Sequence, residues 1–168
     1  MKSLVRKYSF LFLFSGAIIA LDQITKMWVR NNLEIGEVWM PWTWLEPYAR
    51  FVHWYNTGVA FGMFQGLGDI FKILAIIVAI GIIYFYPRVP GGDWTLKIAM
   101  GMQLGGAVGN LIDRAWLGQV IDFIQLYYDR WYWPAFNIAD SAITVGAALL
   151  IVESLWSRDA GSMKNPAG

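Results

Sequence analysis

Two acidic residues, Asp122 and Asp140, border long apolar stretches of the chain. A carboxylate in or beside hydrocarbon is costly, so such a group marks a candidate functional site and needs a partner. Two carboxyls held close together cannot both ionise cheaply, so one pKa rises and the pair shares a proton. A pair in that state can take a proton from water and donate one to a carbonyl oxygen, which is the chemistry of an aspartic hydrolase.

The elements that must position these acids are four apolar runs, which cover about residues 8–29, 67–86, 95–112 and 138–156. Each run has roughly 18 to 22 residues, enough for a helix to cross a hydrocarbon core of about 30 Å. Hydrophobic residues make up 57% of the 168 residues and charged residues 15%. We therefore expect an all-α membrane bundle with four transmembrane helices, forming a single domain over residues 1–168.

The first run could also be interpreted as a secretory signal peptide. It continues through Asp22 and Lys26 without a convincing small-residue cleavage site, so we expect it to be retained as a span.

Composition excludes several other kinds of site. The net charge of +1 argues against a nucleic-acid partner, which would require a basic face. The chain has no cysteine and a single histidine, His53, so thiolate and multi-histidine metal sites are excluded, and we expect no metal or cofactor. The segment around His53, Phe51–Tyr55, is β-branched and aromatic and predicts a short strand. We interpret His53 as a polar strand residue because no serine or cysteine nucleophile motif accompanies it.

The distribution of basic residues predicts the orientation. Lysine and arginine favour cytoplasmic segments, and here they cluster at both ends of the chain and around the turn after the second run. These residues are Lys2, Arg6, Lys7, Arg88, Lys97, Arg158 and Lys164. Both termini are then cytoplasmic, and the connections at about residues 30–66 and 113–135 face outward. The outer connections are rich in tryptophan, which suits anchoring at the headgroup level.

This orientation brings the polar clusters of the chain to the outer membrane boundary. They comprise Asp22, Lys26, Asn56, Asn110, Asp113, Arg114, Asp122, Asn137 and Asp140. Asp22 and Lys26 are four residues apart, so they can form an ion pair on one helix face. Asn137 and Asp140 lie at the start of the fourth run, where the positive end of a helix favours negative charge. Gly101, Gly105 and Gly109 predict close helix packing along the third run.

The same residues stand in five blocks that together resemble bacterial lipoprotein signal peptidase, also called signal peptidase II. The blocks follow one another from the first run into the fourth. They are Asp22-Gln23-Ile24-Thr25-Lys26, Asn56-Thr57-Gly58-Val59-Ala60-Phe61, Gly105-Gly106-Ala107-Val108-Gly109-Asn110-Leu111-Ile112-Asp113-Arg114, Val120-Ile121-Asp122-Phe123 and Phe136-Asn137-Ile138-Ala139-Asp140.

This resemblance implies an aspartic endopeptidase of the bacterial inner membrane that cleaves lipidated prolipoproteins just before the diacylglyceryl-modified cysteine. Asp122 and Asp140 correspond to its catalytic pair. The resemblance assigns substrate contact or orientation of the pair to Asn56, Asn110, Arg114 and Asn137, and support of the site to Asp22, Lys26 and Asp113. It also implies a small extracytoplasmic sheet, a short surface helix near residues 117–127 and an active site at the periplasmic face. We further expect the protein to act as a monomer.

Two other classes of protein compete with the enzyme hypothesis. A proton- or ion-coupled transporter could use Asp122 and Asp140 as a relay, but its acids are expected near the bilayer midplane on broken helices of repeated halves. A non-enzymatic scaffold could use the polar clusters for helix association alone. The scaffold hypothesis does not explain why both aspartates lie outside the interiors of the spans.

Overall fold

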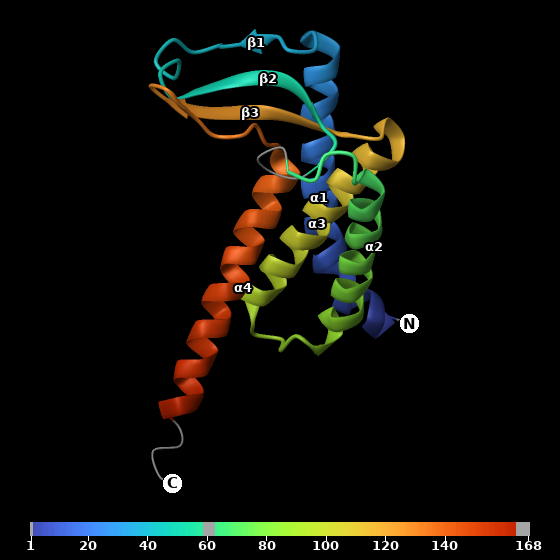
Figure 1. Cartoon of the computed structure of the whole chain (residues 1–168). Coiled ribbons are helices and arrows are strands. Elements are labelled where there is room, and N and C mark those ends of the chain that lie inside the picture. The colour runs from blue at the N-terminus through green and yellow to red at the C-terminus, as the bar shows by residue number, and fades with distance from the viewer. Residues whose placement is uncertain (1, 59–62, 164–168) are drawn as a thin grey trace.

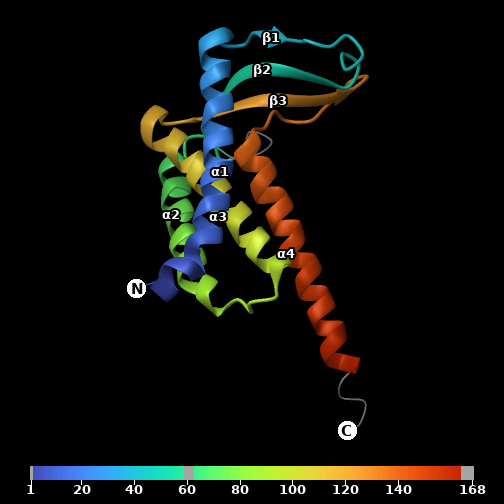
Figure 2. The same ribbon diagram turned by 180° about the vertical axis from the view of Figure 1, so that it is seen from behind.

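The computed structural model of the chain describes residues 2–58 and 63–163. Four long helices stand side by side, and a small sheet lies across one end of them (Figure 1). The helices are α1 (Lys2–Asn32), α2 (Gly68–Phe85), α3 (Trp94–Leu117) and α4 (Ile138–Met163), and a 3₁₀ turn, η2 (Tyr86–Arg88), follows α2. The start of α1 and the end of α4 lie at the end of the bundle away from the sheet (Figure 2).

Helix α3 is the centre of the bundle and contacts the other three helices. Its glycines allow this approach. A Cβ atom at Gly105 would stand 2.8 Å from a side-chain atom of Ile18 on α1, and one at Gly106 would stand 2.4 Å from the backbone oxygen of Ala139 on α4. Both distances are shorter than a carbon side chain tolerates, so the predicted close packing along this helix is confirmed.

Three helices in the described part of the chain are long and apolar enough to cross a membrane: Lys7–Asn32, Gly68–Arg88 and Ile138–Trp156. Helix α3 has 24 residues, or about 36 Å at 1.5 Å per residue, but it is not among the three. Its outer turns carry polar residues, and the neighbouring helices cover its surface. The fourth transmembrane span therefore stays a prediction.

The sheet has four antiparallel strands in the order β1-β2-β3-β4. They are β1 (Val38–Trp39), β2 (Ala49–Asn56), β3 (Val120–Tyr128) and β4 (Trp131–Tyr132). The strand predicted around His53 is confirmed as β2. The register of β2 and β3 shifts between Phe51 and Trp54, and beyond this irregularity Trp54 pairs with Asp122. The irregularity thus sets which residues of β2 stand beside this acid.

The prediction of a short surface helix near residues 117–127 is wrong. Helix α3 ends at Leu117, Gly118 adopts a left-handed conformation with φ of 75°, and strand β3 begins at Val120. Glycine takes this conformation without steric penalty and so ends the helix. The β-branched and aromatic residues that follow then pair with β2, which fixes Asp122 on a strand instead of a loop or helix.

Candidate active site

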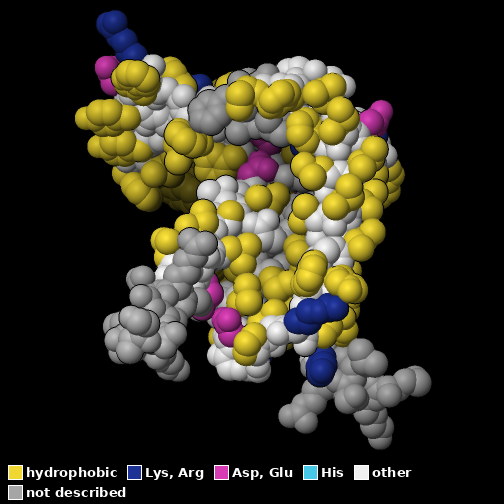
Figure 3. Space-filling view, turned by 60° about the horizontal axis from the view of Figure 1, so that its bottom comes forward, with side chains coloured by type: hydrophobic (Ala, Val, Ile, Leu, Met, Phe, Trp, Pro, Cys, Tyr) yellow, Lys and Arg dark blue, Asp and Glu magenta, His cyan; other side chains and the backbone are white. Residues whose placement is uncertain are grey.

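A cavity of about 680 Å³ lies between α2, α3, α4 and the sheet. Strand β3 contributes Asp122 to its lining, and α4 contributes Asp140. The wall on α2 is apolar and includes Phe71, Leu74 and Val78. Figure 3 shows acidic side chains inside a hollow that is bordered by hydrophobic ones. The cavity therefore offers a polar end and a long apolar wall.

Asp122 is buried, with only 3% of its surface exposed. Each of its oxygens accepts one amide hydrogen bond: Oδ2 from Nδ2 of Asn56 at 3.0 Å, and Oδ1 from Nδ2 of Asn137 at 2.9 Å. Burial, reinforced by repulsion from Asp140, raises the pKa of Asp122 to about 7, although the two amides oppose the shift. Asp122 therefore exchanges its proton near neutral pH.

Asp140 occupies the first turn of α4, where Asn137 caps the helix. The backbone N–H of Asp140 donates to Oδ1 of Asn137 at 2.9 Å, and the backbone N–H of Asn137 donates to Oδ2 of Asp140 at 3.3 Å. This reciprocal pattern satisfies donors that the start of a helix otherwise leaves free. The remaining carboxylate oxygen, Oδ1, accepts from Nδ2 of Asn110 at 2.7 Å.

Asn137 connects the two acids. Its Nδ2 donates to Oδ1 of Asp122, while its Oδ1 and backbone N–H engage Asp140. The side chain is fully buried, so these contacts are not exchanged with bulk water. Asn137 thus holds a strand carboxyl and a helix carboxyl at the wall of the same cavity.

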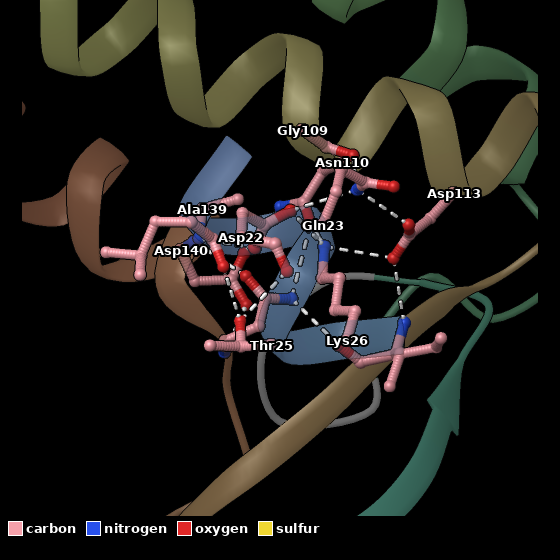
Figure 4. Close-up of polar contacts among 12 residues, drawn as sticks. Asp22, Gln23, Thr25, Lys26, Gly109, Asn110, Asp113, Ala139 and Asp140 are labelled. Carbon is pink, nitrogen blue, oxygen red and sulfur yellow. Dashed lines mark hydrogen bonds and ion pairs between the residues drawn. The ribbon is translucent and has the colours of Figure 1, made fainter. Parts of the chain in front are cut away.

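A buried charged cluster, formed by Asp22, Lys26 and Asp113, lies beside the pair. The Nζ atom of Lys26 is 2.8 Å from Oδ2 of Asp22 and 2.9 Å from Oδ2 of Asp113. It also donates to Oδ1 of Asn110 at 3.0 Å. Figure 4 shows these side chains converging from α1 and α3 on the start of α4. The predicted ion pair between Asp22 and Lys26 is confirmed.

Arg114 closes another side of the cavity. Its Nη2 donates to the backbone oxygen of Gly58 at 3.1 Å, and its guanidinium carbon lies 5.5 Å from the centre of the Phe71 ring. The Nε atom is buried and has no hydrogen-bond partner among the described residues. The arginine therefore joins the loop after β2 to α3, and its Nε keeps a donor to which none of residues 2–58 and 63–163 is hydrogen-bonded.

Residues 14–156 match the signal peptidase (SPase) II family. The chain belongs to this family. It is therefore an aspartic-type signal peptidase. It is 37% identical to a lipoprotein signal peptidase of Mesorhizobium japonicum, with 95% of both chains covered. It is 38% identical to the one of Bacillus subtilis, covering 91% of this chain and 96% of that protein. A solved bacterial membrane enzyme superposes with a TM-score of 0.81 at 29% identity, covering 94% and 93% of the two chains.

The structure of this signal peptidase brings the nine predicted site residues into one contiguous region. Six of them reach the cavity or the acidic pair, and the other three form the charged cluster. The six are Asn56, Asn110, Arg114, Asp122, Asn137 and Asp140, and the three are Asp22, Lys26 and Asp113. His53 does not line the cavity, because its Nδ1 lies 2.8 Å from the backbone oxygen of Leu33 within the packing of β2.

Gln23 is a site residue that the sequence analysis missed. Its Nε2 donates to Oδ2 of Asp22 at 3.1 Å and to Oδ1 of Asp113 at 3.0 Å. It also donates to the backbone oxygen of Gly109 at 3.1 Å. The signal in the sequence is the position of Gln23, which lies three residues before Lys26 and so on the same helix face. The amide adds a donor to two acids that share a single lysine.

Proposed function

We propose that this signal peptidase removes the signal peptide from prolipoproteins immediately before a diacylglyceryl-modified cysteine, with Asp122 and Asp140 activating the attacking water. The observation that carries the proposal is that two carboxyls from different elements share Asn137 at the wall of one cavity. The curated relatives of the chain are lipoprotein signal peptidases, which agrees with this substrate class.

The acidic pair holds one proton between its two carboxyls. A pKa of about 7 at Asp122 supports this state near neutral pH. The ionised member removes a proton from water, whose oxygen attacks the carbonyl carbon before the cysteine. The protonated member donates to the carbonyl oxygen, which gives a neutral tetrahedral diol. A proton then passes to the leaving nitrogen as the C–N bond breaks, leaving a carboxyl on the signal peptide and a free amine on the cysteine.

The cavity suits a substrate that is a peptide at one end and lipid-like along its length. Its polar end holds the acidic pair, and its wall of α2 side chains is apolar. An apolar signal helix can lie along this wall while the acyl chains on the modified cysteine remain in the bilayer. Nε of Arg114, a donor without a partner in the described part of the chain, is available to a peptide carbonyl.

We also propose the placement of the enzyme. As a single multi-pass unit in the bacterial inner membrane, with both termini in the cytoplasm, it would present the sheet and the acidic pair at the periplasmic face. Water then reaches the acidic pair from the aqueous side, and the lipidated peptide enters from the bilayer. We further propose that the enzyme acts as a monomer.

The test is cleavage of a lipidated prolipoprotein by the purified, reconstituted enzyme. We expect Asp122→Asn and Asp140→Asn each to lose about 10²- to 10⁴-fold in kcat while remaining folded, since each loses a proton-transfer group. Asp69→Asn, the same change at an acid whose side chain is 91% exposed, is the matched control and should retain activity. Mass spectrometry of the product should give an N-terminal lipidated cysteine.

Two results would contradict the proposal. Retained turnover in both aspartate variants would remove the acidic pair from the mechanism. Equal turnover of lipidated and unlipidated substrate would remove the proposed dependence on the diacylglyceryl group.

A further inference from the structure

The charged cluster contains the most deeply buried lysine in the described part of the chain. Only 1% of the surface of Lys26 is exposed, and its ammonium contacts Asp22, Asp113 and Asn110. Lys26 does not line the 680 Å³ cavity. An ammonium group has three N–H donors, and here the acceptors are Asp22, Asp113 and Asn110. The third of these contacts links the charged cluster to a residue of the acidic pair's surroundings.

The contact between Lys26 and Asn110 favours one of the two orientations of the amide, and Nδ2 of Asn137, which donates to the same oxygen at 3.2 Å, favours it too. An ammonium group can only donate, so it requires the carbonyl oxygen Oδ1 of Asn110 to face it. The NH₂ group must then point the other way, and it donates to Oδ1 of Asp140 at 2.7 Å. The reversed amide would place an NH₂ against an ammonium and an oxygen against a carboxylate.

The same cluster holds the start of α4 from a second side. Oδ2 of Asp22 accepts from Lys26, while Oδ1 of Asp22 accepts the backbone N–H of Ala139 at 2.9 Å. Ala139 immediately precedes Asp140. The ion pair of Asp22 with Lys26 therefore fixes the backbone that carries the Asp140 carboxyl, while the Asn110 amide fixes the Asp140 carboxylate itself.

We propose that Lys26 is a positioning residue that aims the carboxylate of Asp140 through Asn110 and through the contact of Asp22 with the first turn of α4. This inference rests on the proposed catalytic role of Asp140. It assigns Lys26 an effect on the chemical step and none on substrate binding, because the lysine does not reach the substrate cavity. Loss of Lys26 should lower kcat by about 100-fold, which is the cost of a misplaced reacting group, and should leave KM within about twofold of the wild-type value.

A second cavity makes the proposal testable by chemical restoration. It has a volume of about 270 Å³, lies between α1, α3 and β3, and is lined by Lys26 together with residues such as Ile24 and Trp116. The chain contains no cysteine, so Lys26→Cys introduces a single thiol. Alkylation by 2-bromoethylamine rebuilds a side chain with an ammonium at the reach of lysine. Alkylation by 1-bromopropane gives a neutral side chain of the same length.

The experiment compares the two alkylated forms of Lys26→Cys, with modification verified by intact mass, against the wild type on a lipidated prolipoprotein. We expect the thiol and propyl forms to lose about 100-fold in kcat and the aminoethyl form to recover at least about tenfold. Lys72→Cys, treated identically, is the control at a half-buried lysine on α2 that pairs with Asp69, and it should keep its activity throughout. Equal activity of the propyl and aminoethyl forms, or a change confined to KM, would overturn the proposal.

Gly109→Ala decides the question where the thiol variant does not fold or does not react. A Cβ atom there would stand 2.7 Å from Oδ2 of Asp22, the oxygen that binds Lys26, so it displaces the ion pair without removing a charge. We expect kcat to fall at nearly constant KM, while Gly16→Ala on α1, with nothing within 4 Å of its Cβ, has no effect. Wild-type kcat in folded Gly109→Ala would refute the positioning role. Failure of the wild type to cleave the substrate would instead refute the proposed function.

Discussion

Replacing Asp122 by asparagine should stabilise the protein at alkaline pH even though it removes a proposed catalytic group. The wild-type carboxyl is buried beside Asp140, and its pKa is raised from 3.8 to about 7. Ionising it in the folded protein is therefore costly. An asparagine stays neutral at every pH and avoids that cost.

The direction in which the free energy of unfolding changes with pH follows from proton binding at Asp122. Between about pH 4 and pH 7, the folded state binds a proton at Asp122 that the unfolded state has already lost. The free energy of unfolding therefore falls as the pH rises through this window. Above pH 7 the full penalty is present, and near pH 4 it is mostly gone. The stability of Asp122→Asn relative to the wild type should increase with pH accordingly.

The magnitude comes from the same shift. A rise from 3.8 to about 7 is roughly three pKa units, or about 4 kcal/mol when fully expressed. Between pH 4.5 and pH 8, the linkage relation gives a change of about 3 kcal/mol. The asparagine cannot accept hydrogen bonds from both Asn56 and Asn137, which costs about 1 to 3 kcal/mol. That cost does not depend on pH, so it cancels when the two pH values are compared.

Thermal and denaturant unfolding of the wild type and of Asp122→Asn in detergent, at pH 4.5, 6 and 8, measures this difference in stability. Asp69→Asn controls for the loss of an exposed carboxylate. The reasoning is refuted if the stability difference between Asp122→Asn and the wild type does not change with pH. A difference that moves against the variant as the pH rises would refute it more directly.

Three further predictions concern activity and packing. Because the pair must hold one proton, kcat should decline above about pH 7, the pKa of Asp122, and a plateau through pH 9 in the rate profile would contradict this. Arg114→Lys should lower kcat/KM at least about tenfold, because an ammonium cannot replace a planar fork that binds the Gly58 carbonyl; cleavage at the wild-type rate would reduce the arginine to a topology signal. Gly106→Ala should lower the free energy of unfolding by about 1 to 3 kcal/mol, because its Cβ would meet a backbone oxygen of α4 at 2.4 Å. Gly81 has open space around it, so Gly81→Ala should be neutral or should raise stability by up to about 1 kcal/mol. Thermal unfolding of both variants measures the difference.

The sequence by itself predicted the four long helices and the convergence of the nine polar residues on one region. Apolar runs long enough to cross a bilayer leave few choices for a helical chain, and alternation of direction then assigns each polar cluster to one end of the bundle. This argument brought Asp122 and Asp140 together although 17 residues separate them. It needed neither a strand register nor a side-chain conformation, and the two acids do line the same cavity.

Only the tertiary structure decided how these residues are held. Whether residues 120–128 become a helix or a strand depends on pairing with β2, which lies far away in the chain. The contact of Asp22 with the N–H of Ala139 joins α1 to α4, and Oδ1 of Asn110 on α3 accepts from both Lys26 and Asn137. The physical reason is that hydrogen bonds and buried ion pairs act over a few ångströms between segments that only packing brings together. Residue spacing along the chain carries no information about such distances.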